Sequence, residues 1–314
     1  MVVLLVVCGC GRLNFEGSAD ARIEALSITS PSENAEVQGT TMLVGTCVSG
    51  MPITLGGAGL ASPDDAACEA GAFGVSIVFT DGDGPKLVAV MQGAATVTRT
   101  FVRVTPAMLK SSTVGTKGSA GFMIDCDLVI EAPAELAAGD LLFGMIYSDG
   151  GLNPSITTPG FTRTAFAGGT YVAFWKLVTS AEPLTYTFHV VAGQAPADTC
   201  ESAGVLAVFS GIDPANPILA DSGVVDSNDT NVIAPGVTAP RAAILVGAWG
   251  SNGPASGFTQ IGMIAAASAR STDDNANVLL AYESVVAGPT GTRTATLTQT
   301  RAAAAGLFVI NGKP

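Results

Sequence analysis

Short runs in which apolar and polar residues alternate recur about every 8–12 residues through the first third of the chain, between turns rich in glycine, proline and aspartate. In the segment 71–79, Phe73, Val75, Ile77 and Phe79 occupy every second position. A period of two places these side chains on one face of a strand, where a second sheet can cover them. The pattern predicts a small antiparallel β-sandwich over residues 24–104.

The rest of the chain carries longer strand-like segments and predicts a second, larger β-sandwich over residues 118–314. We expect about nine strands there, arranged as a jelly roll. The 38 glycines and the low share of charged residues, 13%, suit strands joined by tight turns. The sequence therefore predicts an all-β fold of two domains, with the polar segment 105–117 as the linker between them.

Charge and hydropathy narrow the choice of partners. The formal net charge is −12, and the 14 lysines and arginines form no run, which argues against nucleic acid as a partner. The mean hydropathy is +0.45. No stretch approaches the roughly 20 apolar residues that a membrane-spanning helix needs, so we expect no integral membrane protein.

The first ten residues contain an apolar run, Val2–Val7, that ends in Cys8-Gly9-Cys10 and is followed at once by polar, turn-prone residues. This pattern resembles the end of a bacterial lipoprotein signal peptide, although no basic residues precede the run. The resemblance implies a signal segment over residues 1–10, lipid attachment at Cys10 after the small Gly9, and a tether over residues 11–23. The protein would then be exported and membrane-anchored, in the periplasm or on the cell surface. Another export signal and a buried N-terminal strand are the alternatives.

Four further cysteines, Cys47, Cys68, Cys126 and Cys200, form no Cys-x-x-Cys pair, and the single histidine cannot complete a usual zinc site. In an exported protein such cysteines are expected to form disulfides. Four cysteines allow three pairings. The domain division favours Cys47–Cys68 and Cys126–Cys200, because each bond then stays within one domain.

Two families resemble parts of the chain. The first domain resembles the bacterial immunoglobulin-like domains of secreted and surface proteins, which implies a spacer or an adhesive module. The second resembles a β-sandwich module of secreted bacterial and phage-structural proteins, which implies location more than activity. The features that carry the first resemblance are Ile28-x-x-Pro31, Gly45-Thr-Cys47, Gly71-x-Phe73 and the turn 81–84, and those that carry the second are Gly139–Leu142, Pro159–Thr162, Phe174–Lys176, Glu182–Phe188 and Phe209–Asp213.

Signatures of catalysis are scarce. The alternation around His189, the only histidine, places it on the solvent face of a strand, and no Gly-x-Ser-x-Gly motif occurs. Trp175 shares a strand face with apolar residues, so core packing is favoured over a sugar platform. Asp81 and Asp83 stand two residues apart in a turn, a spacing that can begin a calcium site, but a plain turn is the better interpretation. No other cofactor is expected.

These observations favour a non-catalytic surface lipoprotein for adhesion or recognition. An immunoglobulin-like spacer would present a β-sandwich head that binds a glycan or a surface protein through its loops. A secreted carbohydrate-active hydrolase that uses a pair of carboxylates, or an accessory binding module of one, is the first alternative. A structural component of the envelope or of a fibre is the second.

Overall fold

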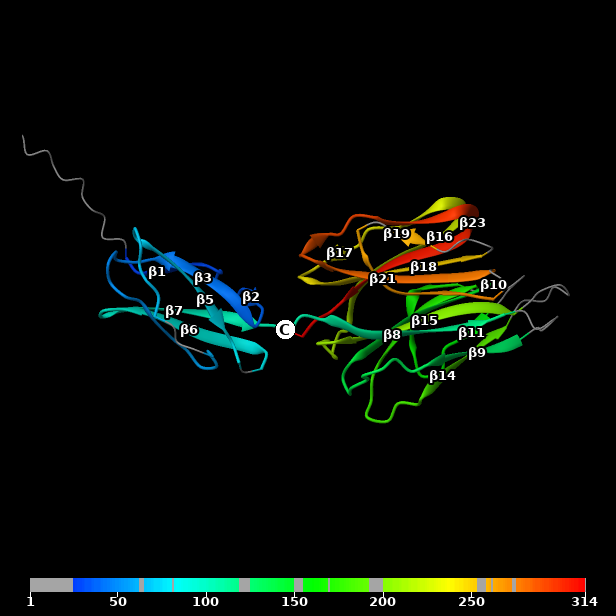
Figure 1. Ribbon diagram of the computed structural model, residues 1–314, viewed down its shortest axis with the longest axis horizontal. Helices are drawn as coiled ribbons and strands as arrows, with labels where there is room; N and C mark the ends of the chain where they lie inside the picture. The colour runs from blue at the N-terminus through cyan, green and yellow to red at the C-terminus, as the bar shows by residue number, and fades with distance from the viewer. Residues whose placement is uncertain are drawn as a thin grey trace, which may run out of the picture. The chain divides into compact units, whose positions relative to one another are not determined.

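The computed structural model describes residues 25–61, 65–80, 82–118, 125–149, 155–168, 170–191, 200–252, 258–260, 262–272 and 275–313. Every helix or strand that these residues form is a β-strand, which confirms the predicted all-β fold (Figure 1). Within the same ranges there is accordingly no helix that could cross a membrane. The chain divides into two compact units, Met1–Val102 and Arg103–Pro314.

Unit 1 is a sandwich of two antiparallel sheets. One sheet has the order β1 (Ser27–Ser30), β3 (Thr40–Thr46), β5 (Ala72–Val78), and the other has the order β2 (Glu36–Val37), β7 (Ala95–Arg103), β6 (Gly84–Gln92), β4 (Thr54–Gly56). Side chains at alternate positions, such as Phe73 and Ile77 on β5 and Val88 and Val90 on β6, meet in one buried core. The alternation of apolar and polar residues in unit 1 thus buries one face of each sheet, and the predicted sandwich is confirmed.

Unit 2 contains three main sheets, here named the central, small and large sheets. The central sheet has the order β12 (Thr162–Ala167), β13 (Tyr171–Leu177), β10 (Leu141–Asp149), β15 (Glu201–Ser210), β8 (Met108–Lys117). The small sheet has the order β11 (Ser155–Thr157), β14 (Thr185–Val191), β9 (Asp125–Glu131). The large sheet has the order β16 (Ile218–Ala234), β23 (Arg293–Ile310), β18 (Ala243–Asn252), β21 (Ala276–Val285), β20 (Ile264–Arg270), with β19 (Thr259–Gln260) beside β23. A short pair, β17 (Thr238–Ala239) and β22 (Gly288–Pro289), completes the unit.

The central sheet is buried on both faces. Phe143 and Met145 on β10 pack into a core shared with the large sheet, whereas Leu142 and Ile146 pack into a second core shared with the small sheet. Figure 1 shows the resulting layers in unit 2, with β10 and β15 between the large sheet and the strands β9 and β14. The packing of one sheet on another that the sequence predicts is present. Unit 2, however, has three layers of sheet, whereas a jelly roll has two.

The large sheet also covers part of its own outer face. The strands β16 and β23 are 17 and 18 residues long, and their pairing is irregular between Ser227 and Asn231. Bulges of this kind bend a strand pair. As a result Leu297, from the first half of β23, enters the same core as Leu307, from the second half, together with the fully buried Trp249.

The prediction of a linker over residues 105–117 is wrong for most of that segment, because Met108–Lys117 forms β8, an edge strand of the central sheet. Its small polar side chains bind the neighbouring layers. The hydroxyl of Thr113 donates to the carbonyl of Glu131, 2.7 Å away, at the end of β9, and that of Ser112 donates to the carbonyl of Ala266 on β20, 2.9 Å away. The serines and threonines that suggested a linker therefore join three sheets at one seam.

Both predicted disulfides are confirmed. Cys47 is bonded to Cys68 within unit 1, and Cys126 to Cys200 within unit 2, with 6.0 Å between the Cα atoms of each pair. Cys126 lies on β9 and Cys200 immediately precedes β15, so the second bond joins the small sheet to the central sheet.

The two disulfides should stabilise their units separately. Removing the bond between Cys126 and Cys200, which are 74 residues apart, should destabilise unit 2 by about 4 kcal/mol on the chain-entropy model. The chain's two tryptophans, Trp175 and Trp249, both lie in unit 2, so their fluorescence reports the unfolding of that unit alone.

In urea titrations we therefore expect the variant Cys126→Ala/Cys200→Ala to lower the midpoint of the fluorescence transition. The matched variant Cys47→Ala/Cys68→Ala should leave that midpoint unchanged. Equal shifts of the urea midpoint in both variants would contradict the conclusion that each disulfide stabilises only its own unit.

Candidate functional site

Two of the residues singled out in the sequence lie outside the described residues, namely Cys10 and Asp81. Asp83 is described and lies half-buried in the turn before β6. Within the described ranges no group of three or more His, Cys, Asp or Glu side chains could hold a metal ion. The lipid anchor and the calcium site therefore remain predictions.

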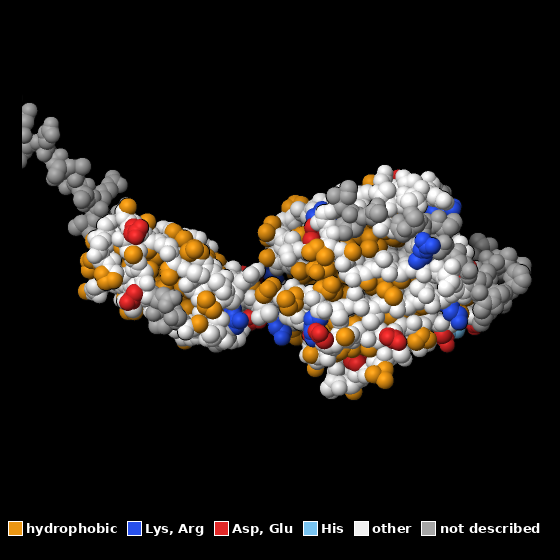
Figure 2. Space-filling view, in the orientation of Figure 1, with side chains coloured by type: hydrophobic (Ala, Val, Ile, Leu, Met, Phe, Trp, Pro, Cys, Tyr) orange, Lys and Arg blue, Asp and Glu red, His pale blue; other side chains and the backbone are white. Residues whose placement is uncertain are grey.

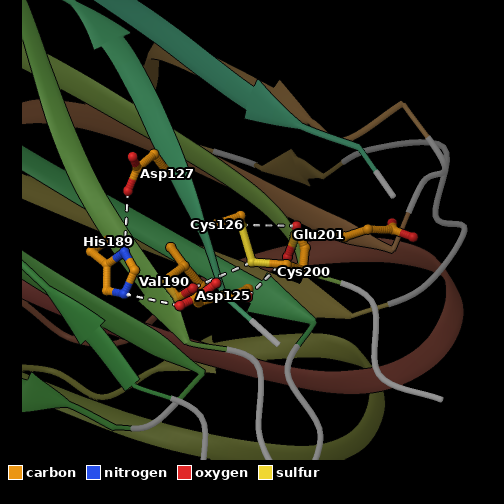
Figure 3. The surroundings of a disulfide bond; sticks show 8 residues. Asp125, Cys126, Asp127, His189, Val190, Cys200 and Glu201 are labelled. Atoms are coloured by element: carbon orange, nitrogen blue, oxygen red, sulfur yellow. Dashed lines mark hydrogen bonds and ion pairs between the residues drawn. A yellow bond between two sulfur atoms is a disulfide. The ribbon is translucent and has the colours of Figure 1, made fainter. Parts of the chain in front are cut away.

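His189 projects from the outer face of the small sheet, as its alternation with Phe188 and Val190 predicts. Its Nδ1 lies 3.1 Å from Oδ1 of Asp127, and its Nε2 lies 3.9 Å from Oδ2 of Asp125, both on the neighbouring strand β9 (Figure 3). The side chains of His189 and Asp127 are 47% and 62% exposed. This is a cross-strand surface pair that water screens, and the covered Cys126–Cys200 bond lies on the opposite face of β9.

A second polar cluster consists of Lys176, Thr179, Glu182 and Tyr186 and is named here the Glu182 cluster. Oε2 of Glu182 accepts hydrogen bonds from Nζ of Lys176 at 2.7 Å and from the hydroxyl of Tyr186 at 2.8 Å. Its Oε1 accepts from the backbone amide of Thr179 at 2.7 Å and from the Thr179 hydroxyl. The carboxylate thereby fixes the turn between β13 and β14, which joins the central and small sheets.

The Glu182 cluster brings together three of the phrases that carried the resemblance to the secreted and phage-structural module. Lys176 and Glu182 come from two of them, and Phe161 comes from the third. Nζ of Lys176 lies 5.5 Å from the centroid of the Phe161 ring and 5.7 Å from that of Tyr186, within range of a cation–π interaction. Phe161 in turn contacts the rings of Phe174 and Phe188. Residues of these three phrases therefore pack against one another between the central and small sheets.

Electrostatics in the Glu182 cluster favour the ionised carboxylate. Burial would raise the pKa of Glu182, but the hydrogen bonds from Lys176, the Thr179 amide and Tyr186 outweigh it and lower the pKa to about 2. Burial, together with the neighbouring Glu182, raises the pKa of Tyr186, so its hydroxyl keeps the proton that it donates.

A third polar cluster, named the strand-end network, was missed by sequence reasoning. It consists of Asp149, Glu201, Asn252, Ser271 and Asn275 and closes one end of the core between the central and large sheets. Glu201 is only 2% exposed, and its carboxylate accepts hydrogen bonds from Asn275 at 2.9 Å and from Ser271 at 3.2 Å. Asn252 donates to Asp149 at 2.6 Å. A buried carboxylate is stable in such a place only when donors surround it.

Asp149 and Glu201 are direct cross-strand partners on β10 and β15, the kind of carboxylate pair that the hydrolase alternative requires. Both side chains are engaged, however, by residues of the large sheet and its connections. Asp149 and Glu201 therefore have a structural role, because their hydrogen bonds close one end of the core between the central and large sheets.

Comparison with known proteins does not assign the chain to a family. No family model matches it, and no curated protein matches its sequence. Among solved structures, the titin domains Z1Z2 in complex with telethonin are 12% identical, with a TM-score of 0.23 over 56% of this chain and 93% of that one. A chimeric titin Z1Z2 that carries a KLER peptide from decorin is 11% identical, with a TM-score of 0.20 over 52% of this chain and 95% of that one. Likeness at this level carries no argument about either unit.

The Glu182 cluster predicts a pH dependence of stability. A carboxylate with a depressed pKa contributes stability that is fully present above the unfolded value, 4.5, and is lost as the pH falls towards about 2. We expect Glu182→Gln to lower the free energy of unfolding of unit 2 by roughly 1–3 kcal/mol at pH 7 and by almost nothing at pH 2.

Urea unfolding followed by tryptophan fluorescence between pH 2 and pH 7 would measure this difference. Glu131→Gln, a change to an exposed residue of β9, is the matched control and should show no such trend. If the difference in the free energy of unfolding between wild type and Glu182→Gln stays constant from pH 2 to pH 7, the ionised Glu182 carboxylate does not stabilise unit 2.

Proposed function

We propose that the protein is an exported, non-catalytic surface lipoprotein in which unit 1 is an immunoglobulin-like spacer and unit 2 is a binding head. The observation that carries the proposal is the pairing of Cys47, Cys68, Cys126 and Cys200 in two covered disulfides. Structural disulfides form and persist in oxidising compartments and are rare in the cytosol. In an exported protein, Cys10 of the Gly9-Cys10 motif can serve as the site of lipid attachment.

The character of the surface supports recognition of a neutral or weakly charged partner, such as a glycan or a surface protein. Figure 2 shows charged side chains scattered over the visible face, with no broad basic patch among the residues coloured there. The three-layer core of unit 2 is a rigid scaffold on which loops and edges can vary without disturbing the packing. A hydrolase that uses Asp149 and Glu201 is the rival, and assembly into an envelope or fibre is a third role.

The anchor is tested by lipid labelling. In bacteria grown with radioactive palmitate, we expect the full chain to be labelled and to sediment with membranes. Cys10→Ser should abolish both, because the acyl chains are attached at that sulfur and several chains together hold a protein on a bilayer. Cys8→Ser is the matched control and should behave as wild type. Undiminished labelling of Cys10→Ser would rule out the assigned site.

Recognition is tested by applying the purified full chain to a glycan array, with and without calcium. We expect binding to a restricted set of neutral glycans, and a dependence on calcium only if Asp81 and Asp83 form a site. Binding to no glycan would count against the leading function and leave a protein partner or self-association as the role to test.

A further inference from the structure

Unit 2 has a concave site at the junction of two sheet edges, where β12 of the central sheet approaches β16 of the large sheet. Its volume is about 230 Å³, and its walls are formed by Ala165 and Phe166 on β12, Tyr171 on β13, and Asp221 to Val225 on β16. This volume is below the roughly 300–1,000 Å³ of pockets for drug-sized ligands, so it suits one small ring. We name it the edge pocket.

A bulge in β12 builds the apolar side of the edge pocket. The pairing of β12 with β13 is irregular between Arg163 and Ala167, which turns Phe166 inward. The Phe166 ring lies over Gly223 and Gly306, which are cross-strand partners in the large sheet. A Cβ atom at Gly223 would lie 2.1 Å from Cδ2 of Phe166, so only glycine leaves room for the ring.

Tyr171 stacks on Phe166, with ring centroids 4.8 Å apart and an interplanar angle of 30°. Burial raises the pKa of Tyr171, so its hydroxyl is neutral and can both donate and accept a hydrogen bond at physiological pH. Tyr171 thus supplies an aromatic surface and a polar group to the same small site.

Asp221 supplies the charge of the edge pocket. Its Oδ2 accepts a hydrogen bond from the backbone amide of Ala165 at 3.2 Å, which fixes the carboxylate against the bulge. A carboxylate only accepts hydrogen bonds, and it has sites beyond the one that this contact uses. No lysine or arginine is among the lining residues. An anionic ligand would therefore be repelled, whereas a ligand with several hydroxyl donors fits.

We propose that the edge pocket binds a single neutral sugar ring, whose C–H groups pack on the side chains of Tyr171 and Val225 while its hydroxyls donate to Asp221 and exchange hydrogen bonds with Tyr171. Val225, which is 58% exposed and shares the Gly223 face of β16, forms the open apolar wall. The proposal rests on the proposed function, glycan recognition, and adds where on unit 2 it occurs and which ligands it accepts.

The test uses the full chain and four neutral probes, the methyl glycosides of glucose, galactose, mannose and N-acetylglucosamine, in saturation-transfer NMR and titration. We expect at least one probe to bind wild type. Asp221→Asn should weaken that binding by about tenfold or more, and Tyr171→Phe by a few-fold, as expected for the loss of a charged and a neutral hydrogen bond respectively. Both variants keep the shape of the side chain. An unchanged urea midpoint in tryptophan fluorescence would show that unit 2 remains folded.

Asp127→Asn, which changes an exposed carboxylate of the small sheet, is the matched control and should bind as wild type. Binding that is equal in wild type, Asp221→Asn and Tyr171→Phe would overturn the edge pocket and leave glycan recognition standing. An active glycan array with no probe bound would do the same. If neither the array nor any of the four probes shows binding, both the edge pocket and glycan recognition by unit 2 are overturned.

Discussion

The fold of unit 2 depends on burial of the central sheet on both of its faces. Leu142 and Phe143, adjacent on β10, belong to different cores, and the same holds for Leu206 and Ala207 on β15. Without this shared layer, the apolar face of the small sheet and the inner face of the large sheet would be exposed to water. The Cys126–Cys200 bond ties the small sheet to the central sheet covalently, at the N-terminal ends of β9 and β15.

A core of three layers has edges where backbone groups of several sheets meet, and each such place needs polar partners. The hydroxyls of β8 satisfy carbonyls of Glu131 and Ala266, which belong to the small sheet and the large sheet. The strand-end network performs the same task between the central and large sheets, with Glu201 as its acceptor. The Glu182 cluster does so at the turn between β13 and β14. The carboxylates of Glu182 and Glu201 therefore lie at boundaries between the layers of unit 2.

In unit 2 the carboxylates that stabilise the interior are different from the carboxylate that lines the edge pocket. The carboxylates of Glu182 and Glu201 are enclosed by donors from the protein itself, whereas Asp221 at the edge pocket has one such contact and faces an open concavity. The pocket exists because a bulge in β12 and a glycine pair in the large sheet let an aromatic ring settle between two sheet edges. Edges are where a β-protein can change its surface without repacking its core.

The sequence by itself determined the all-β class and the inward faces of strands such as β5 and β14, because a period of two is a local property of the chain. It also favoured the correct pairing of the four cysteines, because the division into two domains keeps each bond within one domain. His189 lies on the face that this alternation predicts. The unbroken apolar runs of β10 and β15 also indicate burial on both faces, which a jelly roll of two layers does not provide. Only the tertiary structure decided the third layer, the role of β8 and the edge pocket. Their contacts join residues as far apart as Ser112 and Ala266, and no local pattern specifies which distant strand a given face will meet.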